Sequence, residues 1–114
     1  MWTIYHNPRC SKSRQTMQLL QDRGIEPNTV LYLETPPSAT TLAELLRQLG
    51  ITARDLLRTG EGEYKALQLG EADLSEAQLI DAMAQHPRLI QRPIVVNGDK
   101  AVVARPPEKV LELL

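Results

Sequence analysis

Runs of apolar and polar positions divide the first third of the chain into two strands and a helix. Residues 2–6 are rich in strand-forming side chains and end at the turn pair Asn7-Pro8, after which a helical pattern begins near Ser11. A second strand pattern covers residues 30–33. This order predicts a βαβ unit whose strands are parallel and joined by a right-handed crossover.

The middle of the chain has helical spacing. Leucines at positions 42, 45, 46 and 49 form one apolar stripe, which predicts a helix with Thr41 and Glu44 as its capping box and Gly50 at its end. Two further pairs of capping residues precede more helical segments: Thr52 with Asp55, and Ser75 with Gln78. The middle third is therefore predicted to be helical.

The last third predicts a hairpin and a final helix. Strand patterns at 93–96 and 101–104 flank the turn sequence Asn-Gly-Asp-Lys at 97–100, in which Asn and Gly tolerate a positive φ. Pro106-Pro107 then opens a short helix. We expect its apolar face to be Val110, Leu111 and Leu114.

The order βαβ, helical block, ββα is similar to the thioredoxin- and glutaredoxin-like α/β fold. That fold has a mixed four-stranded sheet covered by helices, and here a helical insertion is expected between the βαβ and ββα halves. Because the chain has 114 residues, of which 42% are hydrophobic, we expect one domain over residues 1–114.

Composition narrows the functional classes. The formal net charge is -1, so no overall positive field is present to bind nucleic acid. No apolar run approaches the roughly 20 residues of a membrane span, and the amino terminus lacks a signal-peptide pattern, so a cytoplasmic protein is expected. A single cysteine, Cys10, excludes an intramolecular disulfide and a zinc site built on several thiolates.

Cys10 lies in the predicted loop between the first strand and the first helix. Unpaired N–H groups at a helix amino terminus stabilise a thiolate, and they also stabilise an oxyanion brought against it. Arg9, Lys12 and Arg14 add cationic character, which favours a lowered pKa for the thiol. A lone cysteine is often a small buried apolar residue, but the polar neighbours of Cys10 favour a nucleophile.

Two residues near Cys10, His6 and Ser13, each have more than one interpretation. His6 either tunes the thiol or ends the strand with a bond to the backbone. Ser13 completes a Cys-x-x-Ser spacing, so its hydroxyl lies one helical turn from the thiol. We expect Ser13 to take part in substrate binding in the site; the alternatives are that it caps the helix or is solvated.

Three arginines are candidates for binding an anion: Arg58, Arg92 and Arg105. A guanidinium group matches a tetrahedral oxyanion through paired hydrogen bonds, although a single surface arginine is usually only solvated. Arg92 and Arg105 bracket the predicted hairpin, so both could face one edge of the sheet. Pro93 stands where thioredoxin-like folds commonly have a cis-proline against the cysteine loop; the alternative is an ordinary trans proline.

Six motifs in order give the chain a family resemblance. The chain resembles the glutaredoxin-coupled arsenate reductases of the ArsC type, in the YfgD-like branch, over essentially its whole length. The motifs are Tyr-His-Asn-Pro-x-Cys at 5–10, Leu-Tyr-Leu-Glu at 31–34, Leu-Leu-Arg at 56–58, Gln-Leu-Ile-Asp at 78–81, Arg-Pro-Ile-Val-Val at 92–96 and Arg-Pro-Pro-Glu-Lys-Val-Leu at 105–111.

The resemblance implies a reductase of arsenate with Cys10 as nucleophile and His6 among the groups that activate it. It further implies that Arg58, Arg92 and Arg105 bind the oxyanion, that glutathione is the co-substrate and that glutaredoxin is the protein partner. No metal or bound organic cofactor is expected. The chain departs from the plasmid-borne relatives at Ser11-Lys12, where they have Gly-Thr, and in lacking their longer carboxy-terminal tail.

Two alternatives use the same residues. One is an Spx-like regulator that binds RNA polymerase, a group that shares the fold and an Arg-Pro-Ile segment but usually switches through Cys-x-x-Cys. Ser13 removes that switch here. The other is a general glutathione-dependent thiol oxidoreductase, for which the three arginines have no evident use.

Overall fold

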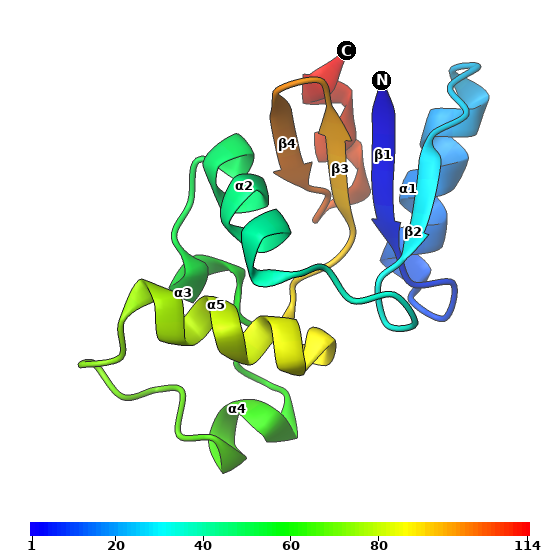
Figure 1. Ribbon diagram of the computed structural model, residues 1–114. Helices are drawn as coiled ribbons and strands as arrows, with labels where there is room; N and C mark the ends of the chain where they lie inside the picture. Colours follow the sequence, from blue (N-terminus) through cyan, green and yellow to red (C-terminus); the bar gives the residue numbers. More distant parts are fainter. The chain divides into compact units, whose positions relative to one another are not determined.

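The computed structural model in Figure 1 describes all of residues 1–114, in two compact units. The first unit combines the two ends of the chain, residues 1–35 and 92–114, and the second is residues 36–91. The second unit is built from helices and one isolated β-bridge, so the helical insertion expected between the two halves of the sheet is present.

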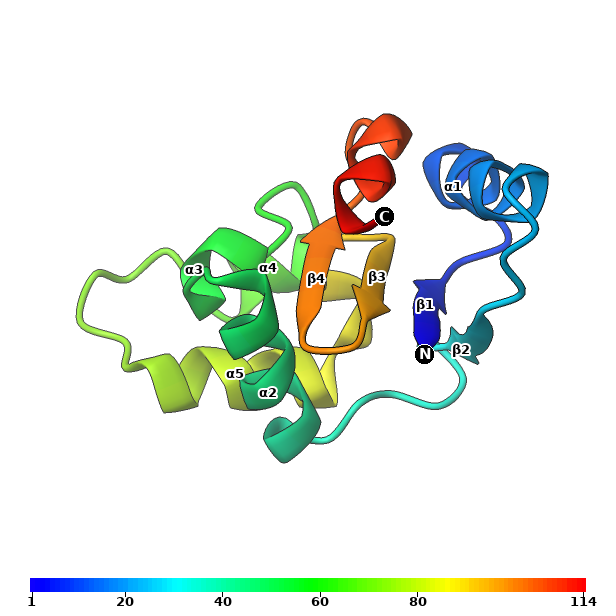
Figure 2. The ribbon, with the colours of Figure 1, turned by 90° about the horizontal axis from the view of Figure 1, so that it is seen from above.

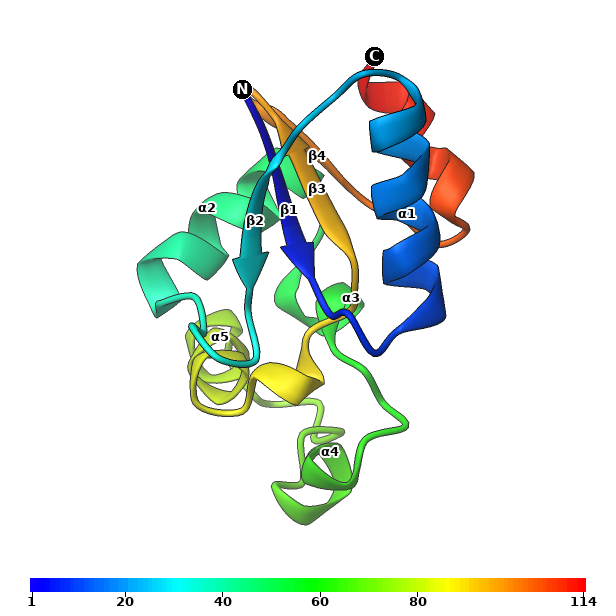
Figure 3. The ribbon, with the colours of Figure 1, turned by 90° about the vertical axis from the view of Figure 1, so that its right-hand side faces the viewer.

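The first unit is a four-stranded sheet with the order β2-β1-β3-β4. Strand β1 runs parallel to β2 and antiparallel to β3, and β3 runs antiparallel to β4, which confirms the predicted mixed sheet. Figures 2 and 3 show helix α1 and the carboxy-terminal helix η2, drawn in red, side by side on one face of the sheet. The elements of this unit are β1 (Trp2–His6), α1 (Ser11–Asp22), β2 (Asn28–Leu31), β3 (Ile94–Asn97), β4 (Lys100–Val103) and η2 (Pro107–Leu113).

The strand register brings four connections to one end of this sheet. His6, the last residue of β1, pairs with Leu31, the last residue of β2. Ile94, the first residue of β3, pairs with Tyr5 and with Val103, the last residue of β4. One end of the sheet therefore carries four connections: those that follow β1, β2 and β4, and the one that precedes β3.

Strand β2 starts and ends two residues earlier than the predicted span 30–33. The carbonyl of Leu31 accepts hydrogen bonds from the N–H groups of Glu34 and Thr35, both at 2.9 Å, so a turn ends the strand there. The sequence pattern misplaced the strand because Tyr32 is apolar and only 2% exposed although it lies in the turn. Burial outside a strand produces the same pattern as burial within one.

The carboxy-terminal helix corrects a second expectation. Helix η2 is a 3-10 helix with three residues per turn, so its inward positions are Pro107, Val110 and Leu113. Leu114, expected on the apolar face from α-helical spacing, is 61% exposed. Val110 and Leu113 belong to a buried core cluster of this unit, together with Ile4, Leu20, Val95 and Ala104.

The hairpin between β3 and β4 is confirmed, but with a shorter turn than the expected 97–100. Asn97 and Lys100 pair with each other, which leaves Gly98 and Asp99 as the turn residues. Gly98 has φ +64°, a conformation that glycine adopts without a steric cost.

In the second unit, helices α2 and α3 pack against α5. None of the helices in the chain is long and apolar enough to cross a membrane. The predicted capping box of α2 is wrong: Ser38 is the N-cap, and its hydroxyl accepts the N–H of Thr41 at 3.1 Å. The helix begins one turn earlier than predicted, because the hydroxyl of Ser38 accepts a capping hydrogen bond just as the hydroxyl of Thr41 was expected to. The other two capping boxes form as predicted. The elements of this unit are α2 (Ala39–Leu49), α3 (Ala53–Leu56), α4 (Gly62–Ala66), α5 (Glu76–Gln85) and η1 (Pro87–Leu89).

Candidate active site

Cys10 is the N-cap residue of α1 and is held in a tight turn. Its N–H donates to the carbonyl of Asn7 at 3.0 Å, and its carbonyl accepts the N–H of Arg14, also at 3.0 Å. The backbone of Cys10 is extended, with φ -94° and ψ 122°, and the residue is 9% exposed. The thiol therefore lies at the amino end of the helix, as predicted, and only a small part of it meets solvent.

Opposing effects set the pKa of the Cys10 thiol. Burial raises the pKa, while the N–H of Ser13, the guanidinium of Arg92 and the N–H of Lys12 lower it, and the net direction is downward. The thiol makes no full capping hydrogen bond to the helix. The helix N–H groups nevertheless stabilise the negative charge of the thiolate once it forms.

The cation that lowers this pKa comes from the far end of the chain. The sequence predicted that the side chains of Arg9, Lys12 and Arg14 lower the pKa of the Cys10 thiol. Of these three residues, only Lys12 lowers it, and it does so through its backbone N–H. Arg9 and Lys12 are exposed, and Arg14 donates through Nη1 to the carbonyl of Pro8 at 2.9 Å. Arg92 supplies the charge instead, because the register places the start of β3 beside the end of β1.

His6 and Ser13 form a hydrogen-bonded pair behind the loop. His6 Nδ1 lies 2.6 Å from Ser13 Oγ, which also accepts the N–H of Asn7 at 3.1 Å. Ser13 is fully buried, so its hydroxyl ties the loop to β1 while its amide stabilises the thiolate. Burial, followed by the charge of Arg14, lowers the pKa of His6. The lowered pKa favours the neutral form of His6, and its hydrogen bond is to Ser13 rather than to Cys10.

Arg92 and Arg105 lie next to each other at the same end of the sheet. Arg105 Nη1 donates to the carbonyl of Arg92 at 3.1 Å. Arg92 Nε is buried and has no hydrogen-bond partner. An unmatched buried donor is uncommon in proteins, and a guanidinium N–H in that condition is suited to an oxygen of an anion.

The structure shows Pro93 after a cis peptide bond, so the cis alternative is confirmed and the trans one is wrong. It also shows a second cis bond, Arg105–Pro106, which the sequence reasoning missed. Each of the two arginines at this edge thus immediately precedes a cis-proline. The only sequence signal was the repeated Arg-Pro pair, which does not distinguish cis from trans.

Arg58 belongs to the second unit. Its backbone N–H donates to the carbonyl of Leu89 at 2.7 Å, and its Nη1 lies 2.5 Å from Glu61 Oε1. The pair is largely buried, with side-chain exposures of 25% for Arg58 and 19% for Glu61. The grouping of Arg58 with the two arginines of the first unit stays a prediction.

The residues of the chain include no group of three or more His, Cys, Asp or Glu side chains that could hold a metal ion. The polar groups around Cys10 are hydrogen-bond donors and a cation. Such a set binds and stabilises negative charge.

A family model described as the ArsC family matches residues 5–113. The chain belongs to the ArsC family. Two relatives show how close the match is. YfgD of Escherichia coli K12 is 56% identical over 112 residues, which are 97% of this chain and 94% of YfgD. A protein named arsenate reductase from Haemophilus influenzae is 51% identical over 112 residues, 97% of each chain.

A solved structure has the same fold as this ArsC-family protein. A structure described as an arsenate reductase from Vibrio cholerae has a TM-score of 0.97 and 52% identity, and the match covers 99% of this chain and 97% of that one. The predicted thioredoxin-like fold of the ArsC type is therefore confirmed.

Proposed function

We propose that this protein reduces arsenate to arsenite, with glutathione as the reductant and glutaredoxin as the partner that restores the thiol. The observation that carries the proposal is the surroundings of Cys10: the helix N–H groups and Arg92 lower the pKa of the thiol, and Arg105 is anchored on the carbonyl of Arg92. Donors that stabilise a thiolate also stabilise the oxygens of a tetrahedral anion attacked by that thiolate. Relatives named arsenate reductase support the choice of anion.

The chemistry needs two thiols, because arsenic gains two electrons and one disulfide supplies them. The Cys10 thiolate attacks arsenic, and one arsenate oxygen leaves as water, which gives a covalent Cys10–arsenic adduct. The glutathione thiolate then attacks the Cys10 sulfur, and the sulfur–arsenic electron pair leaves with arsenite. Cys10 is left in a mixed disulfide with glutathione, which glutaredoxin removes by thiol exchange.

The proposal assigns distinct roles to the residues. Arg92 binds the thiolate and the oxyanion, and Arg105 adds a second guanidinium group to the anion site. His6 and Ser13 are positioning residues that fix the loop before Cys10. No resident metal or organic cofactor takes part in these steps.

The deciding experiment couples NADPH oxidation to glutathione, glutathione reductase and glutaredoxin, with and without arsenate. The wild-type protein is expected to give arsenate-dependent oxidation, and Cys10→Ser to abolish it while the circular dichroism spectrum stays native. More than trace activity in Cys10→Ser contradicts the nucleophile. Arg92→Ala is expected to weaken arsenate and sulfate binding, and unchanged affinity for both contradicts the anion site.

A substrate panel separates this function from the general oxidoreductase. Arsenate, phosphate, hydrogen peroxide and a glutathionylated protein are each supplied with the same reductants. Turnover confined to arsenate supports the proposal, whereas turnover confined to the glutathionylated protein assigns the Cys10 site to thiol exchange.

A further inference from the structure

A cavity lies in the first unit, next to the loop that leads to Cys10. Its volume is about 250 Å³, and it opens at the carboxyl ends of β1 and β2, where His6 and Leu31 line it. These strands are parallel neighbours whose last residues pair with each other. The crevice beyond the carboxyl ends of adjacent parallel strands is a common place for ligands in α/β folds.

Hydrogen bonds within the protein hold both walls of this pocket. One wall is the segment 7–9, in which the N–H of Arg9 donates to Asn7 Oδ1 at 3.0 Å and the carbonyl of Pro8 accepts from Arg14. The other wall is the turn after β2, closed on the carbonyl of Leu31 by the N–H of Glu34 at 2.9 Å. Walls that are already hydrogen-bonded need less ordering when a ligand binds.

The lining combines an apolar surface with two opposite charges. Pro8, Leu31 and Leu33 supply the apolar part, and Leu33 is 41% exposed. Arg9 and Glu34 stand on the opposite walls, and neither forms an ion pair within the protein. The pocket thus offers one free cation and one free anion across an apolar surface.

We propose that this pocket binds the zwitterionic part of a small peptide thiol, with the carboxylate toward Arg9 and the ammonium group toward Glu34. The volume suits one end of a tripeptide rather than all of it. The wall 7–9 leads directly into Cys10, so a peptide held here keeps its thiol beside the loop that carries the nucleophile. The identity of the peptide as glutathione rests on the proposed function, whereas the existence of the site does not.

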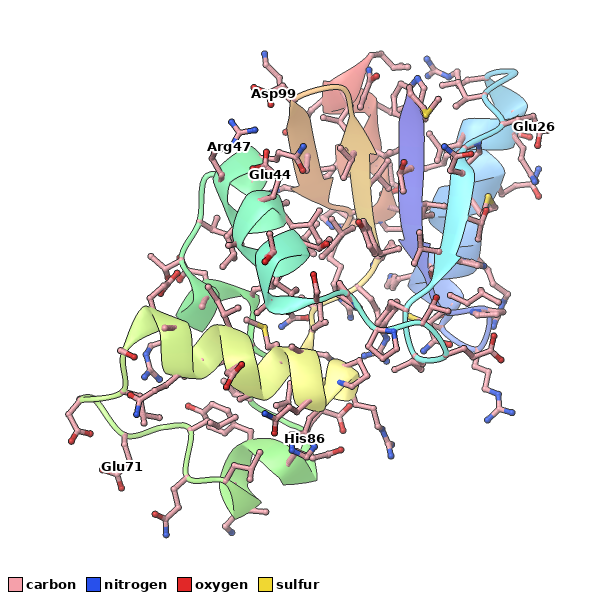
Figure 4. All side chains as sticks on the ribbon, viewed as in Figure 1. Glu26, Glu44, Arg47, Glu71, His86 and Asp99 are labelled. Carbon is pink, nitrogen blue, oxygen red and sulfur yellow. The ribbon has the colours of Figure 1, made fainter.

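Direct binding is measured with S-methylglutathione, which keeps the ammonium and carboxylate groups of glutathione but has no free thiol to react. Calorimetry on the wild-type protein is expected to show binding, and Glu34→Gln and Arg9→Gln are each expected to weaken it about fivefold, the upper end for an exposed ion pair. The matched controls are Glu26→Gln and Arg23→Gln, exposed residues of the same unit that do not line the pocket. Glu26, labelled in Figure 4, precedes β2 in the chain, whereas Glu34 follows it. The controls are expected to leave the affinity unchanged.

Two results overturn the site: no binding of S-methylglutathione to the wild-type protein, or equal affinities in Glu34→Gln and Glu26→Gln. In the coupled assay, Glu34→Gln is expected to raise the KM for glutathione about fivefold more than the KM for arsenate. If arsenate is reduced but this ratio does not change, the pocket proposal fails and the proposed function stands.

The reverse outcome is also distinguishable. If arsenate is not reduced but S-methylglutathione binds and Glu34→Gln weakens it, the proposed function fails and the pocket stands. If Glu34→Gln instead slows only the glutaredoxin step, with unchanged affinity for S-methylglutathione, the pocket contacts the partner protein and the peptide-thiol proposal is overturned.

Discussion

Replacing Ser13 by alanine tests whether the loop before Cys10 is held by one buried hydroxyl. Ser13 Oγ accepts the N–H of Asn7 at 3.1 Å and lies 2.6 Å from His6 Nδ1. The variant removes both bonds and leaves two polar atoms without partners. Because Asn7 and His6 are only half-buried, each lost bond is assigned about 1 kcal/mol, the lower part of the range for an unsatisfied group. The expected loss is therefore about 2 kcal/mol.

Urea unfolding followed by far-ultraviolet circular dichroism measures this loss. With a slope of about 2 kcal/mol per molar urea, typical for a small protein, the midpoint is expected to fall by about 1 M. Ser11→Ala is the control, since Ser11 is exposed in the first turn of the same helix, and its midpoint is expected to change by less than about 0.3 M. Equal midpoints for the two variants would refute the role given to the hydroxyl. A double-mutant cycle with His6→Ala then separates the bond to His6 from the bond to Asn7.

Three further predictions concern the thiol, the histidine and one glycine. The rate of Cys10 alkylation by iodoacetamide is expected to rise with pH, with a midpoint below that of an ordinary thiol. Arg92→Ala is expected to move this midpoint upward, because the variant removes a group that lowers the pKa of the thiol. An unmoved midpoint contradicts the interaction between Arg92 and Cys10. The pKa of His6 is lowered in the folded state, so the unfolded chain binds the proton more readily and the free energy of unfolding falls as the pH drops below about 6.5. Urea midpoints at several pH values should show that this fall is smaller in His6→Gln, and an identical pH dependence argues against the assignment. Gly50→Ala is expected to cost about 1 kcal/mol, because φ is +70° at the end of α2, and a thermal midpoint equal to that of wild type counts against that explanation.

Local signals were sufficient for much of the fold and for the position of Cys10. The turn pair Asn7-Pro8 and the helix start near Ser11 placed Cys10 at a helix amino terminus, and the structure has it there. The hairpin around Gly98 and the capping box of Ser75 with Gln78 also follow from a few adjacent residues. Local reasoning failed where equivalent oxygens compete, as Ser38 and Thr41 do for the start of α2, and where the turn geometry changes from α to 3-10.

The sequence by itself determined which residue types stand next to one another: a lone thiol before a helix, a Cys-x-x-Ser spacing and arginines before prolines. Only the tertiary structure decided which charge serves the thiol. Arg9, Lys12 and Arg14 are close to Cys10 in the chain, yet their side chains point to solvent or to the backbone of Pro8. Arg92 is 82 positions away in the numbering and contributes because β3 pairs antiparallel with β1. Electrostatic interactions depend on distance through space, and backbone pairing between strands sets that distance.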